Sequence, residues 1–449
     1  MRKPIGNVRV AIVKLAVLCG LLAAGPAAPA DQAAGDGWSS AAPREEISPK
    51  FSRRDDGGRD GKGVLAIQAG GREGVHGCWT RTFGVTGGTW YRFEAFRKAA
   101  GVDCPRRCVF ATIEWRDADG KRVPFGEPLV RGYLERARPP AGPEYPADEE
   151  TSDGWTRVAG TYLAPPKATQ ARVDLYLLET PGSVEWSQVT FAATQPPAPR
   201  KVRLAAVHYR PNGGKTAADN CRQFIPLIAK AAEQKADLVV LGEVVPSACR
   251  AGKPADVAES VPGESTKFFA DLARKHRLHI VLSLYERDKH LVYNTAVLLG
   301  PGGELIGKYR KVTLPTSEVE SGVTCGRDYG VFQTALGKIG MMICYDGFFP
   351  EVARNLTANG AEIIAWPVWG CNPQLARARA IENHVYLVSS TYEPPTSNWM
   401  LSGVWSHTGD LLAQGEKFSD VVVAEVDLSR RTLWPYLDDF RAKVERHRP

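Results

Sequence analysis

Two different spacings of apolar residues divide the chain near residue 200. Before that point, short runs that alternate apolar and polar residues are separated by clusters of Gly, Pro, Asp and Asn. Alternation over a few residues between turn-forming clusters predicts strands with one buried face. Many short strands at this spacing indicate an all-β sandwich. The predicted strands are 63–69, 78–83, 90–96, 109–115, 155–163, 171–178 and 184–191.

Beyond residue 200 the pattern changes to apolar strands that alternate with helical segments. Such alternation predicts a layered α/β fold, in which chemistry lies at the carboxyl ends of the strands. A hairpin is predicted over 295–309, turning at Pro301-Gly302-Gly303. The other predicted strands are 202–207, 236–241, 280–285, 340–343, 363–366 and 385–391, and the predicted helices are 218–234, 265–275, 350–359 and 373–382.

These patterns divide the chain into four segments. Residues 31–195 are predicted to form the β-sandwich domain, 196–200 a proline-rich linker, and 201–449 the α/β domain. Residues 1–30 have a basic start, a short apolar run and small residues ending at Ala30, which predicts a secretory signal peptide cut after Ala30. We therefore expect export to the periplasm or the cell exterior, with no integral membrane span after cleavage. An uncleaved membrane anchor is the alternative.

Charge and cysteine content narrow the function classes. The formal net charge is +7, and four of the basic residues lie within 1–30, so the remaining chain carries little net charge. This excludes a nucleic-acid-binding surface as the main function. Cys104 and Cys108 are close enough in sequence to form a disulfide, and they are too few for a zinc site. The segment 136–150, rich in Pro, Glu and Ala, is predicted to be a surface loop.

A single cysteine, Cys344, lies between the predicted strand 340–343 and the predicted helix 350–359. Pro350 suits the first position of that helix, and Gly347 provides a turn before it. Such a bend holds a side chain clear of its strand, and a helix N-terminus favours a thiolate. A cysteine in apolar surroundings is often a small core residue, which is the alternative interpretation.

Two other segments carry groups that a thiol nucleophile needs. The apolar strand 236–241 is followed by Gly242 and then by Glu243. Burial at such a position raises the pKa of a carboxyl group, as suits a general base. The stretch 307–315 contains Lys308, Arg310 and Lys311 among apolar residues. A lysine directed inward there stabilises an oxyanion, whereas Lys308 and Arg310 are interpreted as solvent-exposed.

Together Glu243, Lys311 and Cys344 resemble the Glu-Lys-Cys triad of the carbon-nitrogen hydrolase, or nitrilase, superfamily, in the same chain order. The resemblance implies a four-layer α-β-β-α sandwich whose protomers usually pair across a helical face, and therefore a homodimer or higher oligomer. It covers about 201–428 and rests also on the stretches 202–207, 307–315, 340–351, 377–383 and 403–409.

The resemblance implies a role for each member of the triad. Glu243 matches the general base, Lys311 the cation that stabilises the tetrahedral intermediate, and Cys344 the nucleophile. A thiol that attacks an amide or nitrile carbon forms an acyl-enzyme, which water then hydrolyses. The expected substrate is a small linear amide or N-carbamoyl compound, and no metal or organic cofactor is required.

Supporting positions follow from the same resemblance. Glu318, seven residues after Lys311, matches by spacing a further carboxylate that positions the base and the substrate, and Glu320 competes for this assignment. The backbone N–H of Tyr345 matches a second oxyanion donor.

Two departures from the family pattern bear on the substrate. Tyr345-Asp346 stands where nitrilases commonly have Trp-Glu, which favours amide over nitrile hydrolysis. Thr313 stands where many amidases carry His, so the branch of the family stays open. The alternatives are nitrile hydrolysis in the same fold, or a catalytically silent glycan-binding protein.

The N-terminal segment loosely resembles jelly-roll domains of the carbohydrate-binding and galactose-binding type, through the runs that begin at Trp155 and Val184. This resemblance implies a glycan as the partner of that domain. Its tryptophans, Trp79, Trp90, Trp115 and Trp155, could form a sugar-stacking face, but aromatic residues at alternate strand positions are more often core residues.

Loops after two predicted strands are expected to line the substrate pocket. These are 366–372 and 392–399, which follow the strands 363–366 and 385–391. Arg377 and Arg379 on the intervening helix could bind a substrate carboxylate, but surface salt bridges are the favoured interpretation.

Overall fold

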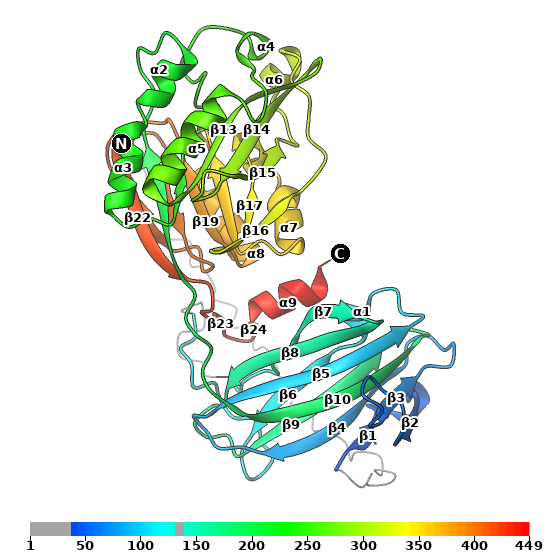
Figure 1. The fold of residues 1–449 in the computed structure, drawn as a ribbon. Helices are drawn as coiled ribbons and strands as arrows, with labels where there is room; N and C mark the ends of the chain where they lie inside the picture. Colours follow the sequence, from blue (N-terminus) through cyan, green and yellow to red (C-terminus); the bar gives the residue numbers. More distant parts are fainter. Residues whose placement is uncertain (1–36, 131–138, 449) are drawn as a thin grey trace, which may run out of the picture.

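The computed structural model describes residues 37–130 and 139–448, and Figure 1 shows its ribbon. The predicted signal peptide, 1–30, lies outside the described residues. Within the described ranges, the helices are all too short or too polar to cross a membrane.

The strands before residue 200 form two antiparallel sheets. Their orders are β1-β4-β9-β6 and β2-β3-β10-β5-β8-β7. Each of the seven predicted strands is confirmed, with shifted ends in most cases. The strands are β1 (Ser39–Ala41), β2 (Lys50–Arg54), β3 (Val64–Gln68), β4 (His76–Gly84), β5 (Trp90–Ala100), β6 (Ala111–Arg116), β7 (Ala147–Ser152), β8 (Trp155–Leu163), β9 (Gln170–Leu178) and β10 (Ser183–Thr194).

Three strands of this part were not predicted, and one of them corrects the predicted loop at 136–150. Strand β7 begins at Ala147 and pairs with β8, and all six of its residues are exposed. An exposed edge strand needs no apolar face, so its sequence shows no alternation. Residues 131–138 of the predicted loop lie outside the described residues.

The tryptophans of this part are mainly core residues, as the favoured interpretation held. Trp79, Trp115 and Trp155 expose 6%, 0% and 9% of their surface, and Trp90 is half-buried. Trp79 and Trp115 belong to the core of these sheets and Trp155 is also buried, so these three rings do not form an exposed sugar-stacking face.

Cys104 and Cys108 are both free thiols, so the disulfide considered from the sequence is not formed. The short helix α1 (Pro105–Cys108) lies between them, and the backbone N–H of Cys108 donates to the carbonyl of Cys104. One helical turn holds such residues roughly 5–6 Å apart at Cβ, whereas a disulfide needs about 3.8 Å.

The chain beyond residue 200 builds two more six-stranded sheets, in the orders β15-β14-β13-β12-β11-β22 and β16-β17-β18-β19-β20-β21. Strands β11, β12 and β13 run parallel, as do β17, β18 and β19. The strands are β11 (Lys201–His208), β12 (Leu238–Val240), β13 (His279–Asp288), β14 (Leu291–Leu299), β15 (Leu305–Arg310), β16 (Val331–Thr334), β17 (Gly337–Met341), β18 (Ile363–Pro367), β19 (Tyr386–Ser390), β20 (Gly403–Trp405), β21 (Leu411–Gln414), β22 (Asp420–Asp427), β23 (Leu433–Trp434) and β24 (Asp438–Asp439).

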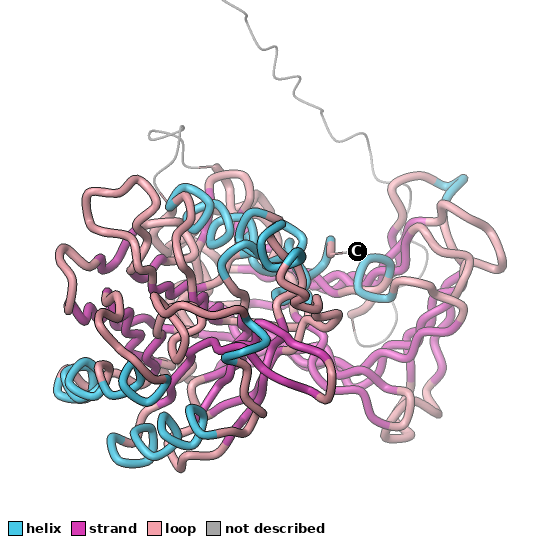
Figure 2. Tube along the Cα trace, turned by 90° about the horizontal axis from the view of Figure 1, so that it is seen from above, coloured by secondary structure: helices cyan, strands magenta, loops and turns pink. Residues whose placement is uncertain are grey.

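Helices flank these sheets, and Figure 2 shows them on the outside of the strands. They are α2 (Ala217–Arg222), α3 (Ile225–Glu233), α4 (Pro254–Val257), α5 (Glu264–His276), α6 (Thr316–Glu320), α7 (Pro350–Ala358), α8 (Pro373–Asn383) and α9 (Phe440–His447). The predicted helix 218–234 is two helices, because Pro226 lies in the first turn of α3 and has no N–H to continue α2.

The apolar runs of the strands are continuous because both faces are buried. Val240 and Val281 pack toward Ile364 of the second sheet, whereas Val239 and Leu282 pack toward Phe269 and the other apolar residues of α3 and α5. Helices α7 and α8 pack against the second sheet through the same core. The loops that follow β12, β17, β18 and β19 begin at the carboxyl ends of these strands. The candidate site lies where these loops meet.

The last residues of the chain return to the N-terminal sheets, and Figure 1 shows α9 between the two parts. Arg431 pairs with Glu127 at 3.1 Å and with Glu144 at 2.6 Å. The N–H of Gly142 donates to Asp438 Oδ1 at 2.9 Å. The predicted domain limits stay a prediction, but these contacts join residues that the limits assign to different domains.

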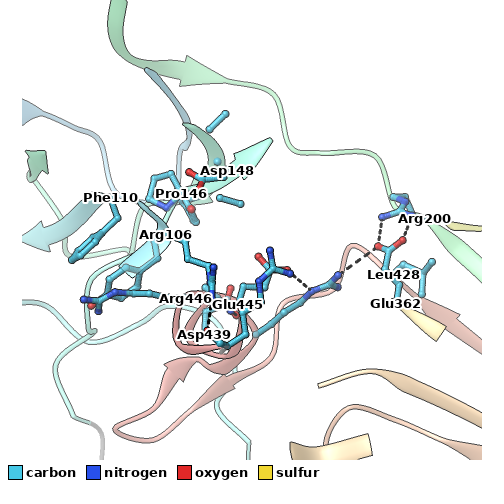
Figure 3. A pocket seen from close by; sticks show the side chains of 18 residues that line it. Arg106, Phe110, Pro146, Asp148, Arg200, Glu362, Leu428, Asp439, Glu445 and Arg446 are labelled. Atoms are coloured by element: carbon cyan, nitrogen blue, oxygen red, sulfur yellow. Dashed lines mark hydrogen bonds and ion pairs between the residues drawn. The ribbon is translucent and has the colours of Figure 1, made fainter. Parts of the chain in front are cut away.

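Helix α9 also borders a cavity of about 420 Å³, shown in Figure 3. Arg200 and Glu362 lie at one side of it and form a bidentate ion pair, with N–O distances of 2.8 and 3.0 Å. Arg106 and Arg446 lie at the other side, and Arg446 stacks on Phe110 at 3.9 Å from the ring centre.

Candidate active site

A buried lysine lies between two carboxylates where the loops after β12 and β15 meet. Lys311 directly follows β15 and exposes 1% of its surface. Its Nζ lies 2.9 Å from Glu243 Oε1 and 2.7 Å from Glu318 Oε2. The structure thus brings together these three predicted residues, which are distant in sequence.

Asn294 joins the same carboxylates from the opposite side. Its Nδ2 donates to Glu243 Oε1 and to Glu318 Oε1, both at 2.8 Å. Sequence reasoning missed Asn294, although a fully buried amide in the apolar strand β14 is a signal that could have found it. Because Lys311 and Asn294 both bridge the pair, the two carboxylates are fixed relative to each other.

The choice between Glu318 and Glu320 follows from their exposure. Glu318, on α6, is buried and bound as described, whereas Glu320 is exposed at the end of the same helix. Residues two apart on a helix point in different directions. Glu318 is therefore the carboxylate that can position Glu243.

Cys344 begins the 3-10 turn Cys344–Phe348, and two residues separate it from the end of β17 at Met341. The strand therefore begins and ends earlier than the predicted 340–343. Its φ is 40°, a left-handed backbone conformation that costs energy for a residue with a side chain. Its Sγ lies 4.0 Å from the carbonyl oxygen of Gly370. Trp366 Nε1 donates to the Cys344 carbonyl at 3.2 Å, and a Cβ at Gly347 would overlap that indole ring.

Asp346 fixes the turn that carries the cysteine. Its carboxylate accepts hydrogen bonds from the N–H of Ile343 and of Thr313, both at 2.9 Å, from Thr313 Oγ1 at 2.6 Å and from the Tyr309 hydroxyl at 2.8 Å. Thr313 and Tyr309 flank Lys311 in sequence. Asp346 therefore sets the position of the Cys344 turn relative to the Lys311 segment.

The structure corrects the interpretation of Arg379 as a surface residue. Arg379 exposes 5% of its surface, and its Nε donates to the carbonyl of Gly347 at 3.2 Å. Its Nη1 also pairs with Glu382 at 2.9 Å, so the expected salt bridge does exist. Arg379 holds the turn after Cys344 and is not free to bind a substrate, whereas Arg377 on the same helix has no such contact among the described residues.

Lys308 is exposed, as the sequence interpretation had it, whereas Arg310 is half-buried, and both side chains pair with Glu286. Lys308 Nζ lies 2.5 Å from Glu286 Oε1, and Arg310 Nη2 lies 2.8 Å from the same oxygen. Successive residues of β15 point to opposite faces of the sheet, so these two lie away from Tyr309 and Lys311.

Both loops that were predicted to line the pocket contact the site. The N–H of Trp369 donates to Glu243 Oε2 at 3.1 Å, and the Tyr392 hydroxyl donates to the carbonyl of Glu243 at 2.6 Å. The Trp369 and Tyr392 rings pack edge to face at 5.2 Å. The loops after β18 and β19 thus hold Glu243 in place.

Burial and charge decide the protonation of these groups. Burial raises the pKa of the Cys344 thiol well above its usual value, and the negative charge of Glu243 adds to this rise. Burial lowers the pKa of Lys311, but Glu243, Cys344 and Glu318 outweigh it, so the net shift is upward. Burial also raises the pKa of Glu318. The upward shift of the thiol pKa favours the neutral thiol over the thiolate at Cys344.

The carbon-nitrogen hydrolase family model matches residues 203–436. A nitrilase from Pyrococcus abyssi is 37% identical over 213 residues, which are 45% of this chain and 81% of that protein. The omega-amidase NIT2 of Danio rerio is 30% identical over 269 residues, 54% of this chain and 92% of that protein. The crystal structure of Saccharomyces cerevisiae Nit3, a member of branch 10 of the nitrilase superfamily, has 27% identity and a TM-score of 0.46 and covers 51% of this chain and 90% of that one.

Proposed function

The chain belongs to the carbon-nitrogen hydrolase family and is an enzyme of that class, and from this premise we propose that it hydrolyses a small amide or N-carbamoyl compound through an acyl-enzyme on Cys344. The observation that carries the proposal is the contact of Lys311 Nζ with both Glu243 and Glu318, beside a cysteine in a strained turn. A lysine bound to two carboxylates keeps its charge, and a charged Lys311 can stabilise an oxyanion.

The first half of the proposed reaction forms the acyl-enzyme. Glu243 takes the proton of the Cys344 thiol while Sγ bonds to the amide carbon. The carbonyl oxygen gains the electron pair and faces Lys311 Nζ and the N–H of Tyr345. Protonated Glu243 then gives the proton to the nitrogen, the C–N bond breaks, and ammonia or an amine leaves.

The second half consumes one water. Glu243 takes a proton from the water as its oxygen bonds to the acyl carbon, and the C–S bond then breaks. The acid leaves, and the proton returns from Glu243 to Sγ. Glu318 and Asn294 hold Glu243 in the same place for both halves, which is how they contribute without touching the reacting carbon.

The preference for amides over nitriles rests on the residues after the nucleophile. Tyr345-Asp346 replaces the Trp-Glu common in nitrilases, and Asp346 is fully committed to hydrogen bonds that fix the turn. Relatives named as a nitrilase and as omega-amidases are both similar to this chain, so nitrile hydrolysis is the second candidate.

We also propose the predicted architecture, the pairing of protomers and the export of the protein. The two α/β sheets with α3 and α5 on one side and α7 and α8 on the other constitute a four-layer sandwich, and the N-terminal sheets a jelly roll. Protomers pair through a helical face, and the N-terminal signal directs export. Mass analysis of the mature protein, with a new terminus at Asp31, and its solution mass would test export and pairing.

Ammonia release and intact-protein mass test the function. We expect wild-type enzyme to release ammonia from aliphatic amides or N-carbamoyl amino acids and to gain the acyl mass, and Cys344→Ala to do neither. Cys325→Ala is the matched control, since Cys325 is an exposed free thiol away from the turn. We expect this variant to keep both signals.

Two outcomes would overturn the proposal. Ammonia release by Cys344→Ala would remove the thiol from the reaction, and release from nitriles alone would establish the second candidate. Thiol alkylation alone is a poor readout, because Cys249 and Cys325 are also exposed and free, so the acylated peptide has to be identified.

A further inference from the structure

A carboxylate beside the candidate site, Glu393, has no role in the reaction described above. Glu393 directly follows Tyr392 in the loop after β19. The Tyr392 hydroxyl donates to the carbonyl of Glu243, and the Tyr392 N–H donates to the carbonyl of Trp369. A Cβ built on Gly370 would lie 2.7 Å from Glu393 Cγ and 3.1 Å from Glu393 Oε1. Because Gly370 has no side chain, the Glu393 carboxylate can lie against its backbone.

Gly370 also contacts the nucleophile. Its carbonyl oxygen lies 4.0 Å from Cys344 Sγ, so one residue separates the reacting thiol from Glu393. The side chain of Glu393 is half-buried. It therefore lies against the residue whose carbonyl oxygen faces the Cys344 thiol.

Glu393 forms no salt bridge with any cation in the ranges that the structure describes. The arginine that influences it is Arg210, whose Nε donates to Cys249 Sγ at 3.4 Å and whose side chain is exposed. An exposed guanidinium is screened by water, so its attraction for Glu393 is weak. A half-buried carboxylate without an ion pair can accept a cationic ligand.

The other charges at the site disfavour an anionic substrate. Lys311 already contacts both Glu243 and Glu318, so it does not have a free charge for a substrate carboxylate. Glu393, which lies against Gly370, adds a third carboxylate to the loops around the site. A substrate carboxylate would be repelled there, whereas an ammonium or guanidinium would be attracted.

Aromatic side chains add to this preference. Tyr345 and Phe348 follow the nucleophile, and Phe348 lies 5.8 Å from the Trp399 ring, which is 44% exposed. Trp369, one residue from Gly370, is 36% exposed. Aromatic faces near a carboxylate are the surroundings that bind organic cations.

We propose that Glu393 binds a positively charged group at the far end of the substrate, and that the enzyme acts on small amides or N-carbamoyl compounds that carry an ammonium or guanidinium. This inference rests on the proposed function and names its substrate class. Glu393 is a specificity-determining residue, and it takes no proton in the reaction.

Three amides of equal chain length test the inference: 5-aminopentanamide, pentanamide and the monoamide of glutaric acid, which are cationic, neutral and anionic. We expect wild-type kcat/KM to be at least tenfold higher for the cationic amide than for either other amide, mainly through KM. In Glu393→Gln the ratio of cationic to neutral amide should fall at least tenfold. Arg210→Gln, which removes the nearby opposite charge, should keep the wild-type ratio.

Binding to Cys344→Ala, measured by calorimetry, separates this inference from the proposed function. We expect tighter binding of 5-aminopentanamide than of pentanamide, and loss of the difference in Cys344→Ala with Glu393→Gln. If wild type releases no ammonia but this binding difference exists, the hydrolysis proposal fails and the Glu393 site stands. Equal binding of the two amides, or a preference for the anionic amide that Arg210→Gln removes, would overturn the inference.

Discussion

Single residues at this site are distinguished by what surrounds them and not by their type. Glu318 and Glu320 are two residues apart, and Lys308 and Lys311 three apart, yet only Glu318 and Lys311 are buried in the site. Burial of charge is costly unless each charge is paired. Lys311 contacts both Glu243 and Glu318, and Asn294 donates to both, so neither carboxylate is buried without a partner.

Glu318→Gln should lower kcat at least 100-fold with a smaller change in KM, because Lys311 and Asn294 would lose a shared carboxylate that holds Glu243 in place. Glu320→Gln, on the exposed side of α6, should change kcat less than twofold. Steady-state kinetics on the best amide substrate measure both. Equal effects of the two substitutions would reject the assignment of Glu318.

Gly370→Ala tests the contact between Gly370 and Glu393. The added Cβ would lie 2.7 Å from Glu393 Cγ, so the Glu393 side chain must move. We expect the preference for 5-aminopentanamide over pentanamide to fall, while the melting temperature stays within a few degrees of wild type. A retained preference in a folded variant would show that Glu393 does not need this position.

At the scale of elements, strands β13, β14 and β15 carry different chemistry on their two faces. One face presents Asn294 to Glu243 and Glu318, and the other carries Glu286, which accepts from Lys308, Arg310 and Thr295. Burial raises the pKa of Glu286, but these donors outweigh it and lower the pKa to about 2. Strand pairing, and not sequence proximity, creates both groups.

The low pKa of Glu286 makes a prediction about stability. Since its pKa is below the ordinary value of 4.5, its contribution is present above about pH 4.5 and is lost as the pH falls toward about 2. Glu286→Gln should lower the free energy of unfolding by about 2 kcal/mol at pH 7, after allowance for partly exposed partners. The difference from wild type should shrink between pH 4.5 and 2, as measured by urea unfolding.

Asp288→Asn is the matched control for Glu286, because Asp288 pairs with the same Arg310 but is 46% exposed. We expect it to cost less than about 1 kcal/mol. A Glu286→Gln effect that is constant from pH 7 to pH 2 would contradict the linkage argument.

At the scale of the whole molecule, the end of the chain connects the two parts. Arg431 exposes 14% of its side chain and pairs with Glu144, which exposes 2%, and with Glu127. Its guanidinium also lies 5.2 Å from the Tyr162 ring centre. Segment 429–448 is therefore part of the contact between the N-terminal sheets and the α/β sheets.

Arg431→Leu should destabilise the protein by about 3–5 kcal/mol, because it leaves the buried Glu144 and the half-buried Glu127 without their cation. Arg430→Leu, one residue earlier and exposed, should cost less than about 0.5 kcal/mol. The urea midpoint of unfolding, followed by fluorescence, measures both. Equal midpoints for wild type and Arg431→Leu would mean that the contact contributes nothing to stability.

The sequence by itself determined much of the local secondary structure of this protein. Alternation predicted seven strands before residue 200, and apolar runs predicted the longer buried strands and the main helices after it, because each pattern depends on neighbours within a few residues. The order Glu243, Lys311, Cys344 at strand ends identified the candidate site. Exposed strands such as β7 were not predicted, because they bury no apolar face.

Only the tertiary structure decided which polar groups meet. Asn294, Arg379, Glu393 and Arg431 each contact a partner from another part of the chain, and nothing in their local sequence specifies that partner. Strand register brings Asn294 to Glu243, and a missing side chain at Gly370 makes room for Glu393. Such contacts depend on the packing of whole sheets and loops, so the physical basis of specificity became visible only in the folded molecule.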